Sequence, residues 1–104
     1  MSRPDTASKL TPDEAKRKIA LYLREGRLKL SVHCRRDSMP RRNVSTPDIV
    51  NVLATGEIIR EAEWDEDYNN WKYTVQGVDE EGEELRAVTV FFDADLVLLI
   101  VTVF

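Results

Sequence analysis

The strongest constraint on the fold lies in the second half of the chain, where segments of strand character alternate with connections too short to hold a helix. The segments are residues 58–64, 71–78, 86–92 and 96–104, and the connections are residues 65–70, 79–83 and 93–95. Parallel neighbours need a crossover of a dozen or more residues, whereas antiparallel strands join through tight turns. The pattern therefore predicts successive hairpins and an antiparallel meander.

The last of these segments also predicts its own position in the sheet. Residues 96–104 are apolar at every position except Thr102. Such a run is typical of a strand that is buried on both faces, and so of a central strand. In the first hairpin, Trp64 and Trp71 flank the turn, so we expect their rings to pair across the two strands.

Two helices are predicted ahead of the sheet by their start and stop signals. Thr11 and Glu14 have the spacing of a capping box, with Pro12 at the first helical position, and Gly26 supplies a stop. A second helix is predicted over residues 45–56, because a Ser-Thr cap precedes a proline and a glycine ends the segment. Apolar residues recur at helical spacing in both, namely Ala15, Ile19, Tyr22 and Leu23, and then Ile49, Val52 and Leu53.

Together these elements predict an α+β fold in which N-terminal helices pack on one face of an antiparallel β-sheet. Residues 1–10 are polar and lack periodicity, so we expect a flexible tail there. Residues 11–104 are expected to form a single domain, because a chain of 104 residues has room for one compact core.

The stretch between the two helices allows two interpretations. Residues 28–34 alternate apolar and polar side chains with the period of a half-buried strand, and the alternation then dissolves into a basic stretch. Alternatively, a short helix starts near His33 with Ser31 as its cap. In that case Pro40 is expected to end the helix or to break it.

The single cysteine and the single histidine limit the chemistry of the chain. Cys34 cannot form an internal disulfide, and His33 as the only histidine excludes the usual zinc clusters, so no metal or cofactor is expected. Cys34 also falls on the inward phase of its predicted strand, which favours a place in the core over a nucleophilic role. No signal peptide is recognisable, and the longest apolar run, residues 96–101, is too short to cross a membrane. A cytoplasmic protein without membrane association is expected.

The charge is distributed unevenly along the chain. Residues 1–43 contain 12 Lys and Arg against 5 Asp and Glu, a net charge of +7, whereas residues 44–104 contain 3 against 14, a net charge of −11. This asymmetry predicts a basic surface suited to an anionic partner. The alternative is that the two halves lie against each other and neutralise one another in the fold.

From about residue 28 onward the chain resembles the bacterial family called "domain of unknown function 4258". The matching features are the strand that runs into His33, the basic pair Arg41-Arg42, the Val44-Ser45 step into a helix, the stretch Thr55-Gly56-Glu57-Ile58-Ile59, Gly77 at a strand end, and the segment Ile100-Val101-Thr102-Val103-Phe104. The family usually has an Arg and an apolar residue four and five positions after its His. This chain has Asp37 and Ser38 there.

The resemblance implies a relationship to small toxin nucleases of the RelE and BrnT type, several of which cleave RNA without a metal. It therefore implies RNA as a partner, a cognate antitoxin or another protein as a second partner, and an endoribonuclease as the candidate activity. The alternative is a non-catalytic protein-interaction or regulatory module with the same fold. A fold relationship alone does not decide between these two functions.

Metal-free RNA cleavage needs a base, an acid and cations that stabilise the charged phosphorane. His33 is the candidate for proton transfer, since histidine exchanges protons near neutral pH. The candidate catalytic residues are His33, Arg36, Arg42 and Lys72, and the candidate RNA-binding residues are Lys29, Arg35 and Arg41. The alternatives are a histidine that only caps a helix and arginines that only form a solvated helix face.

The geometry of the predicted strand also suggests where the two charge blocks lie. Lys29 and Arg35 share the outward phase of that strand, and the remaining arginines follow directly after it. We therefore predict a continuous positive patch formed by Lys29, Arg35, Arg36, Arg41 and Arg42. The acidic residues of a later hairpin should lie mainly on another surface, and these are Glu61, Glu63, Asp65 and Glu66.

Overall fold

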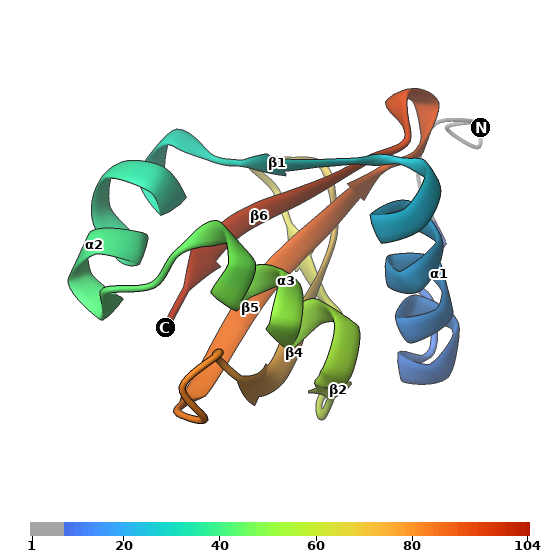
Figure 1. Cartoon of the computed structure of the whole chain (residues 1–104). Helices are drawn as coiled ribbons and strands as arrows, with labels where there is room; N and C mark the ends of the chain where they lie inside the picture. Colours follow the sequence, from blue (N-terminus) through green and yellow to red (C-terminus); the bar gives the residue numbers. More distant parts are fainter. Residues whose placement is uncertain (1–7) are drawn as a thin grey trace.

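The computed structural model describes residues 8–104 and confirms the α+β class (Figure 1). The helices are α1 (Pro12–Glu25), the π-helix η1 (Cys34–Ser38), α2 (Met39–Arg42), α3 (Thr46–Thr55) and the short 3₁₀ helix η2 (Asp93–Asp95). The strands are β1 (Arg27–Leu30), β2 (Glu57–Ile58), β3 (Glu63–Asp65), β4 (Asn70–Val78), β5 (Glu84–Phe92) and β6 (Val97–Val103). The part of the predicted tail at residues 1–7 lies outside the described residues. Lys9 and Leu10, at its end, already bond to Glu61 and Tyr73.

The sheet is mixed, and this corrects the prediction of a purely antiparallel one. The strand order is β1-β6-β5-β4-β2, and β3 also pairs with β4. The predicted meander is present, because β4, β5 and β6 pair antiparallel in succession. However, β1 lies parallel to β6. The long stretch of chain between β1 and β6 permits this arrangement, since a parallel pair needs a long connection. Because β6 lies between β1 and β5, it has the central position predicted for it.

The two longer helices lie on the same side of the sheet and build the core (Figure 1). The fully buried side chains include Ile19 of α1, Ile49 and Leu53 of α3, and Leu98 and Ile100 of β6. Both predicted helix starts are confirmed as capping boxes, the first with Thr11 and Glu14 and the second with Ser45 and Asp48. The local start signals therefore fix where each helix begins, and the spacing of the apolar residues sets which face it buries.

Two further details of the sheet can be compared with the prediction. Trp64 and Trp71 are direct cross-strand partners, and their ring centroids lie 5.3 Å apart in an edge-on arrangement, as predicted. The prediction of a single strand over residues 58–64 was wrong. This stretch is split into β2 and β3, with residues 59–62 outside both. The split leaves the middle of β4 without a strand partner on that side.

Residues 32–42 form a helical segment, which confirms the second of the two interpretations of this stretch. β1 ends at Leu30, and the Ser31 hydroxyl caps the helical turn by accepting from the Cys34 N–H at 2.9 Å. Pro40 does not end this segment, which corrects that expectation. It falls in the first turn of α2, after a π-helical turn in which the Met39 N–H bonds to the Cys34 carbonyl. The π-helical turn shifts the backbone hydrogen bonds from the i−4 to the i−5 carbonyl directly before the proline, and the segment continues past it.

The helical segment also covers the edge of β6 beyond the end of β1. The Ser31 hydroxyl donates to the Val101 carbonyl at 2.7 Å, and the Val103 N–H donates to the Ser38 hydroxyl at 3.3 Å. Two serine hydroxyls thus take the place of the strand that would otherwise pair there. Uncovered sheet edges invite pairing with other chains, so this cover protects the fold.

Candidate functional site

The basic surface consists of Arg27 and Lys29 of β1 with Arg35, Arg36, Arg41 and Arg42 of the helical segment 32–42. Arg27 and Lys29 alternate with Leu28 and Leu30, which pack against the core. Their side chains therefore leave the sheet on the face away from α1 and α3. Segment 32–42 lies beside the carboxyl end of β6, at the other end of the molecule from α1 (Figure 1).

Within segment 32–42 the buried and exposed positions separate clearly. Cys34 is completely buried and Ser38 is 5% exposed, so these two side chains anchor the segment to the core. Cys34 thus has the core position predicted for it, and burial raises the pKa of its thiol. Arg35, Arg36 and Arg41 are exposed to solvent. Because Cys34 and Ser38 face the core, these three guanidinium groups face solvent.

None of the six cations of the basic surface forms a salt bridge with a carboxylate of residues 8–104. The salt bridges of this part of the chain lie elsewhere, as in the pairs Lys9–Glu61 and Lys18–Asp93. The alternative that the acidic half neutralises the basic half by direct pairing is therefore not supported. These cations retain their capacity to attract an anionic partner.

Arg42 differs from the other arginines of the segment. It is half-buried, and its guanidinium donates to the Glu84 carbonyl oxygen at 2.7 Å. This bond ties α2 to the beginning of β5. Arginine has five N–H donors, so the remaining ones stay available to a ligand. Arg42 is first of all a structural link, and it borders the basic surface.

His33 lies at the beginning of the segment and contacts Asp37. Its Nδ1 is 3.3 Å from the Asp37 carboxylate, and the two side chains are 58% and 57% exposed. The i, i+4 spacing places the imidazole beside this carboxylate on one side of the segment. Asp37 occupies the position at which the resembled family usually has an Arg, so this chain has a histidine–carboxylate pair there.

Lys72 lies apart from the other predicted catalytic residues. The register runs across the sheet from Lys29 to Leu99, Val90 and Lys72. Three strand spacings separate the backbones of Lys29 and Lys72, or about 14 Å. The Lys72 ammonium is 3.9 Å from the Asp65 carboxylate instead. The structure thus gathers His33 and the arginines of one segment, while Lys72 lies across the sheet from them.

The acidic residues of the β3–β4 region lie on the side of the sheet away from β1, as predicted. The strand order places β3 beyond β4, with β5 and β6 between them and the basic surface. The position of a second acidic stretch was not predicted from the sequence. The β4–β5 turn at residues 79–83 lies next to α2, because Arg42 bonds to Glu84 directly after it. Such a neighbour is set by tertiary packing and leaves no local signal in the sequence.

Sequence reasoning also missed Arg27 and Arg86. Arg27 precedes Lys29 by two residues, so the period of a strand would have placed it on the same face. Arg86 lies on β5 between Leu85 and Ala87, which are buried in the core, so it too faces away from the helices. Its guanidinium carbon lies 5.6 Å from the centre of the exposed Phe104 ring.

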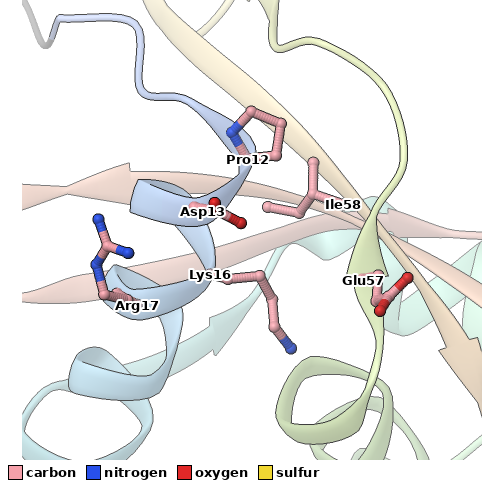
Figure 2. A pocket seen from close by; sticks show the side chains of 6 residues that line it. All are labelled: Pro12, Asp13, Lys16, Arg17, Glu57 and Ile58. Carbon is pink, nitrogen blue, oxygen red and sulfur yellow. The ribbon is translucent and has the colours of Figure 1, made fainter.

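A pocket of about 420 Å³ lies between α1 and β2, away from the basic surface (Figure 2). It is lined by Pro12, Asp13, Lys16, Arg17, Glu57 and Ile58. Lys16 donates to the Gly56 carbonyl, so its ammonium is already engaged. The remaining charges are of both signs, and the pocket therefore has no clear preference for an anion.

A cluster of polar groups joins α1 to the β5–β6 connection. The Tyr22 hydroxyl donates to the Asp93 carboxylate at 2.6 Å, and the Lys18 ammonium lies 2.8 Å from the same oxygen. Burial and the neighbouring Asp93 raise the pKa of Tyr22. Burial opposes the ionisation of Asp93, but the bonds from Lys18 and Tyr22 prevail and lower its pKa. These contacts stabilise the ionised carboxylate and give the cluster a structural role.

The part of the chain that the structure describes holds no group of three or more metal-ligating side chains. Among the same residues, no helix is long and apolar enough to cross a membrane.

The family comparison covers most of the chain. A profile described as "Domain of unknown function (DUF4258)" matches residues 30–104. The chain belongs to this family. The match begins at the last residue of β1 and includes segment 32–42 and the remainder of the sheet, whereas α1 precedes it. No curated protein and no solved structure gives a significant match.

Proposed function

We propose that this chain is an RNA-contacting domain whose basic surface holds phosphate groups. The observation that carries the proposal is the set of exposed arginines, Arg35, Arg36 and Arg41, without a carboxylate partner in residues 8–104. A guanidinium group matches the geometry of a phosphate and binds it through two parallel hydrogen bonds. Arg27 and Lys29 of β1 add two further exposed positive charges.

A second candidate function is metal-free RNA cleavage, and the contact between His33 and Asp37 favours it. In this reaction the 2′-hydroxyl gives its proton to the Nε2 atom of His33, and the 2′-oxygen bonds to phosphorus. The 5′-oxygen then leaves with a proton from water. Arg36, three residues after His33 on the same helical segment, stabilises the charge of the phosphorane. Lys72 takes no part in this step, because it lies across the sheet.

We further propose that the domain acts in the cytoplasm as the toxin-like member of a toxin–antitoxin pair. The support is the resemblance of its family to the RelE and BrnT toxins, together with the exposed basic surface. An acidic antitoxin segment would compete with RNA for the same arginines.

If the domain is a toxin, induced expression in bacteria should slow growth and degrade bulk RNA, and the variant Arg35→Gln/Arg36→Gln/Arg41→Gln should lose both effects. Normal growth and intact RNA with the unaltered chain would remove the toxin part of the proposal.

RNA binding itself is tested by fluorescence anisotropy with a labelled single-stranded oligoribonucleotide. The triple variant Arg35→Gln/Arg36→Gln/Arg41→Gln should bind about 10- to 100-fold more weakly near 0.15 M salt, since three phosphate contacts are lost.

The matched control removes the same charge from α1 and from the stretch after β2, as in Arg17→Gln/Arg24→Gln/Arg60→Gln. These three residues are exposed and lie outside segment 32–42. The control should keep most of the affinity. An equal loss in both triple variants would mean that net charge, and not the basic surface, governs binding.

A further inference from the structure

Phe104 is an exposed aromatic side chain next to the basic surface. The residue is 45% exposed, whereas Val103 before it is 2% exposed. Two backbone hydrogen bonds with Arg86, of 2.9 and 3.0 Å, hold Phe104 in register beside β5. Because Val103 points into the core, Phe104 points to the opposite face, away from α1 and α3.

The Arg86 guanidinium is held in place beside the Phe104 ring. Its Nε donates to the Gln76 side-chain oxygen at 3.0 Å, and its Nη2 lies 3.8 Å from the Glu84 carboxylate. The guanidinium carbon is 5.6 Å from the ring centre, which is within the range of a cation–π contact. Arg86 thus supports the ring from one side and leaves part of it open to solvent.

The ring lies close to segment 32–42. The Ser38 hydroxyl accepts from the N–H of Val103, the residue directly before Phe104. On the other side, Arg42 bonds to the Glu84 carbonyl, two residues or about 7 Å along the strand from Arg86. Arg42 of this segment therefore lies near Arg86, which contacts the exposed ring.

We propose that Phe104, supported by Arg86, is a stacking platform for one unpaired base of a single-stranded RNA. This inference rests on the proposed function, because it assigns the class of RNA that the basic surface binds. Bases in a duplex are stacked on each other, and only a single strand offers a free base face to an aromatic ring. The arginines hold the phosphates on either side of the stacked base, and the binding therefore favours single strands over duplexes.

The test uses a single-stranded oligoribonucleotide with one 2-aminopurine, a fluorescent base that is quenched when it stacks. The unaltered chain should quench the probe and bind it more tightly than a duplex of the same sequence. Phe104→Leu should abolish the quenching and weaken single-strand binding by about 5- to 150-fold, the range found for removal of one stacked base. Phe104→Trp should restore both.

Leu21→Ala is the matched control, because Leu21 is 39% exposed on α1 and remote from segment 32–42. It should leave both readings unchanged. Thermal unfolding of each variant verifies that the fold is retained.

Two results would overturn the inference, and they are distinguishable. If Phe104→Leu binds and quenches like the unaltered chain while the triple arginine variant has lost affinity, the stacking platform is wrong and RNA binding stands. If the unaltered chain binds neither single strands nor duplexes, the proposed function fails and the platform fails with it.

Discussion

The bond between Ser38 and Val103 gives the most direct test of how segment 32–42 is attached to the sheet. Ser38 is 5% exposed, and its hydroxyl accepts from the Val103 N–H and donates to the Cys34 carbonyl. In Ser38→Ala the Cys34 carbonyl keeps its bond from the Met39 N–H, but the buried Val103 N–H loses its partner. A buried donor without a partner costs about 1–3 kcal/mol.

For a domain of this size, each kcal/mol lowers the unfolding midpoint by roughly 4–8 °C. We therefore expect Ser38→Ala to unfold about 4–24 °C below the unaltered chain, and the Val103 amide to exchange its hydrogen faster. Thr46→Ala is a suitable control, since Thr46 is exposed and its side chain makes no hydrogen bond within residues 8–104. An unchanged midpoint together with a protected Val103 amide would refute the idea that this hydroxyl seals the edge of β6.

Three further predictions concern catalysis, pH dependence and packing. If the domain cleaves RNA, His33→Ala should slow cleavage about 100-fold or more with the fold intact, and an unchanged rate in a gel assay would exclude His33 from proton transfer. Because the folded-state pKa of Asp93 is lowered, its charge stabilises the fold above about pH 4 and that stabilisation is lost as the pH falls through the folded-state pKa. Asp93→Asn should therefore unfold with a weaker dependence on acid pH, and parallel pH profiles for the two proteins would contradict this. Gly56→Ala should destabilise the fold by about 1–3 kcal/mol in urea unfolding, because its Cβ would lie 2.6 Å from the Gln76 carbonyl oxygen, whereas an unchanged midpoint would mean that β4 moves away at no cost.

Local sequence signals predicted a large part of this fold. Both helix starts, the Trp64–Trp71 pair and the central position of residues 97–103 depend on near neighbours or on the apolar pattern of one segment. Short polar connections likewise predicted the meander, because a two-strand hairpin needs no information from elsewhere in the chain.

The errors arose where distant parts of the chain decide the structure. The parallel pairing of β1 depends on β6, which follows it by more than 60 residues. The sequence left a longer strand and a short helix near His33 both open for this stretch, and the hydrogen bonds that join Ser31 and Ser38 to β6 favour the helix. Pro40 was expected to stop that segment, and the preceding π-turn accommodates it.

Part of the candidate site was predictable because it depends on a single stretch of the sequence. The arginines of segment 32–42 are consecutive or nearly so, and one exposed segment therefore brings them together. The predicted inclusion of Lys72 required a contact across four strands, which the register does not provide. Arg86 and Phe104 lie near segment 32–42 only because β5 and β6 pair beside it.

The central claim is that the arginines of segment 32–42 bind RNA phosphates, and the salt dependence of binding tests it most directly. The logarithm of the association constant should fall with the logarithm of salt concentration by about 0.7 per phosphate neutralised on a single strand. Replacing Arg35, Arg36 and Arg41 together with Gln should flatten this slope by about two units, while Arg17→Gln/Arg24→Gln/Arg60→Gln should leave it nearly unchanged. A slope that is equally steep in the first triple variant and in the unaltered chain would contradict the account.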